Sequence, residues 1–250
     1  MDNLSFGNLH TLGNVVKETE LYRQFHFPEM LVMYDANYIE FKKMPSVPEF
    51  KEAEEYLINF HQAHGQDHVK FYFPDGEKPD SNLEIYLTSN GYELDFMELY
   101  GIRPSGFPEI NPNLSINVQV VSEDNETAFL DLNYKHSLDY GKNYADQKRE
   151  LLKRQLKDTK HVKVLAYYEG EPAGYVHLIQ SDDTVEIDDL HVDDEFQKKG
   201  IGSALQQFVM SNYPEKIVIL IADGEDTPRE MYQKQNYQYV GLRYEVLRTF

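Results

Sequence analysis

Residues 185–205 read Val185-Glu186-Ile187-Asp188-Asp189-Leu190-His191-Val192-Asp193-Asp194-Glu195-Phe196-Gln197-Lys198-Lys199-Gly200-Ile201-Gly202-Ser203-Ala204-Leu205. This order predicts a strand, a tight loop and a helix whose apolar residues recur at nearly every fourth position. Gly200 and Gly202 lack side chains, so successive backbone N–H groups at the helix start can point into one concavity. Helix N-termini carry unpaired donors and a positive dipole end. The sequence therefore predicts an anion site on residues 198–203.

Two other phosphate-binding loops do not match these letters. A P-loop needs Gly-x-x-x-x-Gly-Lys-Ser/Thr, and this string is absent from the sequence. The dinucleotide fingerprint needs a third small residue where Leu205 stands, and it follows a strand that opens a parallel unit. We therefore set both aside.

The C-terminal half has a regular order of expected elements. Turns rich in Gly, Pro and Asp join three consecutive strand-like runs, which favours an antiparallel meander. An uninterrupted apolar run at 217–221 indicates a strand covered on both faces. The expected strands are 116–121, 162–168, 173–180, 185–192, 217–221 and 237–247, and the expected helices are 126–137, 144–157, one beginning at 201, and 227–235.

A segment with three prolines and a glycine, residues 103–113, is the best linker in the chain. We place a domain boundary there, giving domains 1–110 and 111–250. In the first domain we expect strands at 31–34, 38–42, 69–73 and 93–100, and helices at 48–61 and 83–88. This order repeats the second half of the C-terminal domain. Glu84, Tyr86 and Asn90 also recur at a constant offset as Glu230, Tyr232 and Asn236, which favours an internal duplication.

Gln197, Gly200 and Gly202 fit the pattern Gln/Arg-x-x-Gly-x-Gly/Ala, and Leu190 and Val192 fit the strand that precedes it. In these letters the C-terminal half resembles the GNAT superfamily of N-acetyltransferases. The family's helix ending Tyr-x-x-x-Gly-Phe corresponds here to residues 232–237, with Asn and Tyr in the last two places. Asn tolerates the left-handed backbone conformation that ends a helix, so we expect the helix stop to survive.

The resemblance implies an α/β fold, with a mixed, largely antiparallel central sheet flanked by helices, in tandem. It also implies acetyl-CoA as co-substrate, in a cleft where strands 185–192 and 217–221 splay apart. Backbone groups around His191, those of Leu190 and Val192, would bind the pantetheine arm. The pyrophosphate would lie on Gln197, Lys198, Lys199, Gly200, Ile201, Gly202 and Ser203. The corresponding N-terminal stretch 44–51 has two prolines and no glycine, so we expect no cofactor there.

Acetyl transfer to an amine needs one group to remove the amine proton and another to protonate the departing thiolate. Glu186 stands where histone-acetylating relatives carry their general base, and Asp188 follows on the same strand face. Tyr232 matches the tyrosine that many relatives use as general acid. A bound water is an alternative base, and His191, expected to point away from Glu186, is a reserve candidate.

Composition limits the other function classes. The net charge of −19 comes from 43 acidic and 24 basic residues, and such a field repels nucleic acids but attracts cationic amines. The absence of cysteine excludes disulfides, thiolate zinc sites and a cysteine nucleophile, and fits a reducing cytoplasm. We expect no metal, because the histidines at 61, 64 and 68 read as a solvated helix end, and no export signal or membrane span.

The expected function is therefore transfer of an acetyl group from acetyl-CoA to a primary amine of a small molecule or peptide. The alternative is a catalytically silent acyl-CoA-binding or protein-interaction module. Nothing in the sequence sets the oligomeric state.

Overall fold

The computed structural model describes residues 4–224 and 228–250, which divide into two compact units. The C-terminal unit comprises residues 100–221 and 228–239, and the N-terminal unit comprises residues 4–99, 222–224 and 240–250. The chain therefore returns to the N-terminal unit for its last residues, and residues 100–110 belong to the C-terminal unit. This packing differs from the single expected division after residue 110. That residue 110 marks the boundary between two duplicated domains stays a prediction.

The C-terminal unit is built on a mixed sheet with the strand order β5-β10-β9-β8-β7-β6. β6 to β9 form the expected antiparallel meander, and β10 pairs with β9 in parallel. The strands are β5 (Glu93–Ile102), β6 (Ile116–Val120), β7 (His161–Tyr168), β8 (Glu171–Gln180), β9 (Thr184–Val192) and β10 (Ile217–Asp223). The helices are α3 (Glu126–Ser137), α4 (Lys142–Gln155), α5 (Ile201–Asn212) and α6 (Pro228–Lys234).

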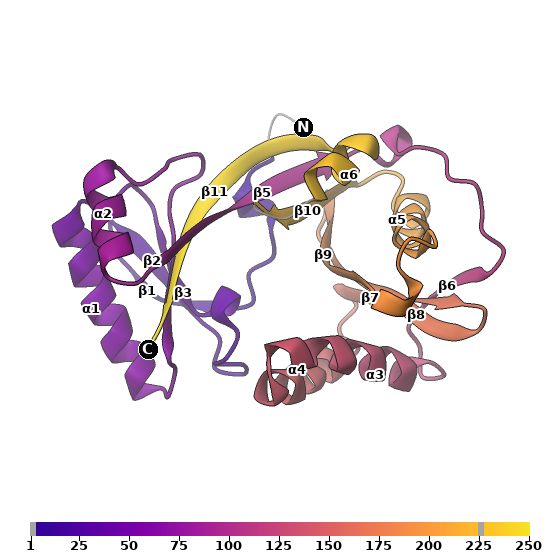
Figure 1. Ribbon diagram of the computed structural model, residues 1–250, viewed down its shortest axis with the longest axis horizontal. Helices are drawn as coiled ribbons and strands as arrows, with labels where there is room; N and C mark the ends of the chain where they lie inside the picture. Colours follow the sequence, from indigo (N-terminus) through magenta and orange to yellow (C-terminus); the bar gives the residue numbers. More distant parts are fainter. Residues whose placement is uncertain (1–3, 225–227) are drawn as a thin grey trace. The chain divides into compact units, whose positions relative to one another are not determined.

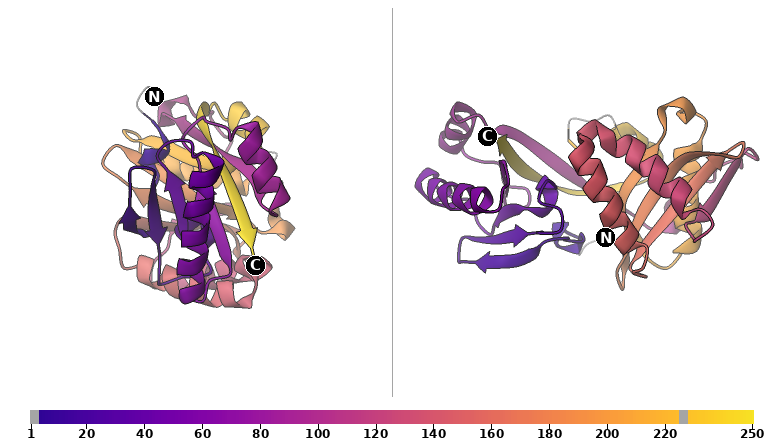
Figure 2. Two further views of the ribbon diagram at one scale, coloured as in Figure 1. Left: turned by 90° about the vertical axis from the view of Figure 1, so that its left-hand side faces the viewer. Right: turned by 90° about the horizontal axis from the view of Figure 1, so that it is seen from below.

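Helices cover both faces of this sheet, with α3 and α4 on one face and α5 on the other (Figures 1 and 2). Successive side chains of a strand point to opposite faces of the sheet, so neighbouring residues of β8 pack against different helices. Tyr175 packs in a buried cluster with Phe129 and Leu130 of α3, whereas Gly174 lies against Ile201 at the start of α5. The apolar alternation of β7 and β8 thus supplies both faces with core residues.

The N-terminal unit has the strand order β1-β2-β3-β4-β11-β5. β1 (Asn14–Glu18), β2 (Tyr22–His26) and β3 (Tyr38–Phe41) are antiparallel, β3 and β4 (His68–Tyr72) are parallel, and β4 pairs antiparallel with β11 (Gln238–Thr249). α1 (Val47–Ala63) joins β3 to β4, and α2 (Ser81–Ser89) lies beside α1 (Figure 1). The core is aromatic, with Phe41, Phe50, Phe71 and Phe73 almost fully buried.

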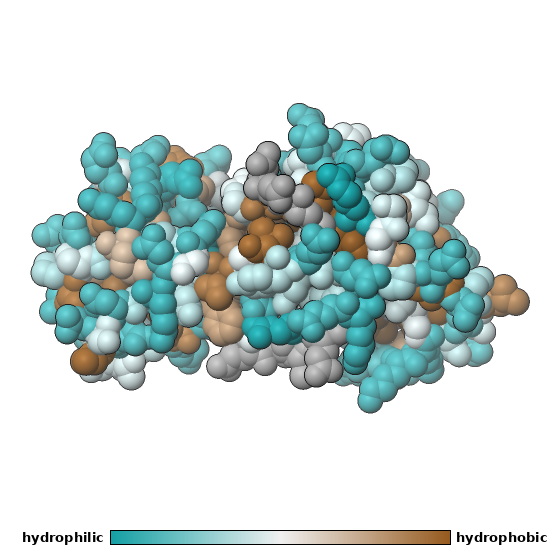
Figure 3. Space-filling view, turned by 90° about the horizontal axis from the view of Figure 1, so that it is seen from above, coloured by the Kyte–Doolittle hydropathy of each residue, from teal (hydrophilic) through white to brown (hydrophobic). Residues whose placement is uncertain are grey.

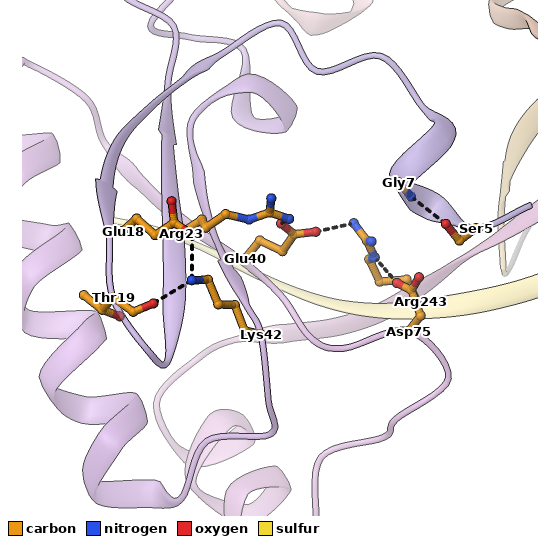
Figure 4. A network of polar contacts seen from close by, with 9 residues as sticks. All are labelled: Ser5, Gly7, Glu18, Thr19, Arg23, Glu40, Lys42, Asp75 and Arg243. Carbon is orange, nitrogen blue, oxygen red and sulfur yellow. Dashed lines mark hydrogen bonds and ion pairs between the residues drawn. The ribbon is translucent and has the colours of Figure 1, made fainter.

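Ion pairs hold the end of the last strand within the N-terminal unit (Figure 4). Arg243 of β11 lies 2.7 Å from Asp75 and 3.1 Å from Glu40, and Glu40 also pairs with Arg23 at 2.5 Å. The Arg243 side chain is only 14% exposed, so these pairs are screened less than surface pairs. The expected strand 237–247 is therefore present, but residues 240–247 belong to the N-terminal unit.

Two expectations for the N-terminal half are wrong. Residues 31–34 form no strand, and Tyr34–Ala36 is instead a 3₁₀ helix. These apolar residues lie in a turn that the buried Asn37 side chain stabilises. Its amide donates hydrogen bonds to the carbonyl oxygens of Met30 and Met33. The unit also contains β1 and β2, which we did not predict. The mixed, largely antiparallel sheet flanked by helices is confirmed.

Candidate functional site

The loop before α5 has the backbone geometry that the glycines predict. Gly200 is the N-cap of α5 and adopts a left-handed φ of 91°, and Lys198 also has a positive φ of 61°. Gly200 has no side-chain oxygen, and no side chain caps this helix. The first-turn N–H groups are thus left for an acceptor from outside the helix.

A second glycine brings α5 close to the sheet. A Cβ on Gly174 of β8 would lie 2.8 Å from the His191 backbone oxygen, which real structures do not tolerate, and 3.1 Å from Ile201 Cγ2, which is a tight contact. A Cβ on Gly202 would lie 3.7 Å from Val192 Cγ2, an ordinary contact. Packing therefore requires a glycine at 174 but not at 202. Sequence reasoning missed Gly174, although a glycine inside a strand run signals close backbone approach.

β9 and β10 pair along only part of their length. Their parallel register joins Thr184–Ile187 to Ile217–Leu220, while β9 continues to Val192 in its pairing with β8. The pairing of β8 with β9 also shifts, because Leu178 lies opposite Ile187 and His177 opposite Asp189. Asp188 is thus the extra residue of a β-bulge, which bends a strand and re-aims its side chains. Pairing with β10 ends where this bulge begins.

The two candidate carboxylates of β9 have different surroundings. Glu186 is 6% exposed and lies opposite Ile179 of β8 and Ile219 of β10, in the paired part of the strand. The Asp188 side chain is 35% exposed, and its Oδ2 lies 2.8 Å from His177 Nδ1. Burial raises the pKa of the Asp188 carboxyl, but the adjoining His177 ring, together with Lys148 and Lys163, outweighs this and holds the pKa below its usual range.

The bulge also changes where His191 points. His191 lies opposite Tyr175, and Glu186 lies opposite Ile179, two β8 residues that share a face. The expectation that His191 points away from Glu186 is wrong, because one extra residue reverses the alternation. The His191 ring lies 3.6 Å from that of His136 on α3 and 5.9 Å from that of Tyr175.

Tyr232 lies on α6, a different element from the candidate carboxylates. It is half-buried, and its ring packs 5.4 Å from the Tyr100 ring and 5.5 Å from the Tyr237 ring. The helix ends as expected, because Asn236 adopts a left-handed φ of 66° and Tyr237 N donates to Tyr232 O at 2.9 Å. Glu230, the other residue of the repeated set, has a side chain outside the described part.

No group of three or more His, Asp or Glu side chains among residues 4–224 and 228–250 is arranged to hold a metal ion. Of the histidines at 61, 64 and 68, two are fully buried and their rings lie 4.7 Å apart. Burial is the main cause that lowers the pKa of His61 to about 4. The expectation of a solvated helix end is therefore wrong for His61 and His68.

The sequence pattern of the acetyltransferase (GNAT) family matches residues 129–237. This part of the chain belongs to the GNAT family. The match includes β9, the glycine loop, α5 and β10. Residues 4–100 match a domain described as a domain of unknown function, DUF5613. No curated protein matches the chain.

Solved structures share this fold. A functionally unknown conserved protein from Staphylococcus epidermidis is similar over 99% of this chain and 98% of its own, with 29% identity and a TM-score of 0.91. A GCN5-related N-acetyltransferase from Kribbella flavida covers 94% and 88%, with 13% identity and a TM-score of 0.64. A tandem GNAT protein from the clavulanic acid biosynthesis pathway covers 85% and 75%, with 10% identity and a TM-score of 0.53.

The N-terminal unit repeats the element order of the GNAT domain. The order β9-α5-β10-α6-β11 corresponds to β3-α1-β4-α2-β5, and in each set the first two strands pair in parallel. The helix starts differ, because a capping box of Ser46 and Glu49 closes α1, and Pro48 lies in its first turn. Tyr86, the counterpart of Tyr232, donates to Glu54 Oε2 at 2.5 Å.

Proposed function

We propose that the chain is an N-acetyltransferase that moves an acetyl group from acetyl-CoA to a primary amine of a small molecule or peptide by direct attack. One observation carries the proposal. A short loop joins the half of β9 that no longer pairs with β10 to the uncapped start of α5, and Asp188 marks the start of that half. An anion-binding helix start, free strand edge and carboxylate thus lie within one strand-loop-helix segment.

The described residues fit acetyl-CoA in donor chemistry. The N–H groups of residues 198–203 suit a pyrophosphate, because helix starts and left-handed turns bind anions without a charged side chain. The backbone of Leu190 and Val192, beyond the end of the β9–β10 pairing, suits the amides of the pantetheine arm. Acetyl-CoA supplies the thioester, whose carbonyl carbon the amine attacks.

The proton transfers fall to side chains on two elements. Glu186, directly or through a water, takes the proton that the amine nitrogen loses as it bonds to the acetyl carbon. The carbon–sulfur bond breaks, and Tyr232 donates its phenolic proton to the thiolate. Asp188, at the more exposed bulge, is the second carboxylate available to the amine. With no cysteine to form an acyl-enzyme, we expect sequential kinetics.

The acidic composition supports an amine as the acceptor, because a negative field attracts cations. Hydrophilic residues cover most of the face seen in Figure 3. No helix in the described part of the chain is long and apolar enough to cross a membrane. The lack of cysteine supports a reducing compartment such as the cytoplasm.

A thiol-release assay over amino acids, polyamines, aminoglycosides and peptide N-termini tests this function. Tyr232→Phe and Glu186→Gln should each lower turnover about 10²–10⁴-fold, with acetyl-CoA affinity nearly unchanged by calorimetry. Tyr239→Phe is the matched control, since Tyr239 is exposed and packs on the same Tyr100 ring. Acetyl-CoA binding without thiol release for any amine would favour the silent acyl-CoA-binding module. Parallel-line kinetics would rule out direct attack.

A further inference from the structure

Two histidines form a hydrogen-bonded chain that ends at Asp188. His177 of β8 is 3% exposed and His161 of β7 is 9% exposed. His177 Nδ1 lies 2.8 Å from Asp188 Oδ2, and His177 Nε2 lies 3.0 Å from His161 Nδ1. The Asp188 side chain at the end of this chain is 35% exposed.

Hydrogen-bond chemistry gives this chain one direction. An ionised carboxylate only accepts, so His177 must donate to Asp188 from Nδ1. A neutral His177 then has a lone pair on Nε2, which His161 Nδ1–H fills. Burial lowers the pKa of His177 to about 4, against the opposing effect of Asp188, so the ring is neutral at neutral pH. His161 thus supports the tautomer of His177 that donates to Asp188, and His177 holds Asp188.

We propose that His177, fixed by His161, is a positioning residue that holds the Asp188 carboxylate in the bulge of β9, with Oδ2 bound to His177 and Oδ1 presented to the ammonium group of the acceptor. This inference rests on the proposed function and adds to it a residue that binds the cationic amine. The bulge places Asp188 where pairing with β10 ends, next to the part of β9 to which the proposed function assigns the pantetheine arm.

Other charged groups face this chain. Lys163 of β7, 1% exposed, donates to Gln155 Oε1 of α4 at 2.8 Å, and burial holds its pKa well below the usual range. Lys148 of α4 acts electrostatically on His177, Asp188 and Asp189, and burial raises the pKa of the Asp189 carboxyl. Within this environment, His177 contacts Asp188 directly, and Lys148 and Lys163 also favour the ionised form of the carboxyl.

Nuclear magnetic resonance tests the positioning without any acceptor. In a protein labelled at Asp ¹³Cγ, the Asp188 resonance should titrate below the usual aspartate range. His177→Leu removes the donor and should raise this pKa, whereas His177→Asn keeps an N–H near the place of Nδ1 and should restore it. His61→Leu is the matched control, because it removes an equally buried histidine from the other unit. An Asp188 pKa that does not change in His177→Leu would overturn the positioning role.

Ammonium binding is tested with n-butylamine, a primary amine without other polar groups. Butylammonium should shift the Asp188 ¹³Cγ resonance, and His177→Leu should weaken this binding ~10-fold or more, as expected when a hydrogen bond to a charged group is lost. In turnover, the acceptor KM should rise more than kcat falls, and the acidic limb of kcat/KM should move to higher pH. Unchanged butylammonium binding in either His177→Leu or Asp188→Asn would overturn the proposal. Absence of thiol release with every amine would instead refute the acetyltransferase and leave the resonance titrations to decide on Asp188.

Discussion

Helices α5 and α1 occupy the same place in two repeated β-α-β segments, yet they begin in opposite ways. Gly200 leaves the first turn of α5 without a side-chain cap. At α1, Glu49 Oε2 accepts from Ser46 N at 2.8 Å, and Pro48 removes one donor altogether. Further along, the two corresponding tyrosines also have different neighbours: Tyr86 donates to the buried Glu54 of α1, and the Tyr232 ring packs against those of Tyr100 and Tyr237.

This difference teaches how one arrangement serves two purposes. A polar group satisfied within the fold adds stability but cannot bind anything else. A group left unsatisfied at the surface adds little stability and remains available to a ligand. The N-terminal unit uses its helix start for stability, whereas the proposed function assigns the open helix start of the GNAT domain to an anion.

The largest expected effect comes from a carboxylate placed at the open helix start. Ser203→Asp adds a negative charge in the first turn of α5, where the helix dipole favours it and should stabilise the fold by roughly 0.3–1 kcal/mol. The same charge repels a bound pyrophosphate. At about 4 Å and an effective dielectric constant of 20 the repulsion is about 4 kcal/mol, so acetyl-CoA should bind on the order of 10²–10³-fold more weakly by calorimetry. Ser203→Asn is the neutral control, and equal affinities of the two variants would place the pyrophosphate elsewhere.

The next effect concerns acid stability in the N-terminal unit. His61 has an ordinary pKa of 6.5 when unfolded and about 4 when folded, chiefly because it is buried. As the pH falls from about 6.5 to 4, the unfolded chain binds a proton that the native state does not, so stability is lost across this window. The loss is on the order of 3 kcal/mol. Hydrogen exchange between pH 7 and 4 measures the free energy of unfolding of the N-terminal unit. This free energy should fall less steeply with decreasing pH in His61→Leu than in the unsubstituted protein. A variant of the exposed His64 should keep the steep fall of the unsubstituted protein.

Local patterns determined how much of the site the sequence could predict. Glycine spacing located the loop, and the residues before it located β9, because both depend on neighbouring letters. The bulge at Asp188 could not be predicted, since one extra residue leaves the composition of a strand unchanged. The contact of His161 with His177 depends on the register of β7 and β8, and register is not written in either strand alone.

The same limit applies to the fold. The meander and the repeated element order follow from periodicity and turn residues. The return of β11 to the N-terminal unit does not, because a long strand keeps its alternation whichever neighbours it has. β1 was missed because its residues are mostly exposed and show no apolar alternation.

A smaller effect separates the two glycines of the open loop. Gly200→Ala forces a side chain into the left-handed region at φ 91°, which should lower the free energy of unfolding of the GNAT domain by about 1–2 kcal/mol. A Cβ on Gly202 makes only ordinary contacts, so Gly202→Ala should be neutral or raise stability by up to about 1 kcal/mol. Chemical denaturation followed by hydrogen exchange measures both. Equal stability of the two variants would mean that the left-handed turn is not needed.

The smallest effect should come from opening the closed helix start. Ser46→Ala removes the cap of α1 and should lower the free energy of unfolding of the N-terminal unit by about 0.5–1 kcal/mol, with acetyl-CoA affinity unchanged. The hydrogen bonds from Ser46 lower the pKa of Glu49 below 4.5, so the stabilisation they give is present above that pH and lost as Glu49 is protonated in the folded state. The loss of unfolding free energy caused by Ser46→Ala, measured by hydrogen exchange, should therefore become smaller at acidic pH.

Ser46→Gly copies the uncapped start of α5, yet it should not create an acetyl-CoA site. Pro48 still lacks an N–H, and none of the residues 47–51 is a glycine. If calorimetric titration of acetyl-CoA into Ser46→Gly revealed a second binding site, the cap alone would account for the difference in acetyl-CoA binding between the two units.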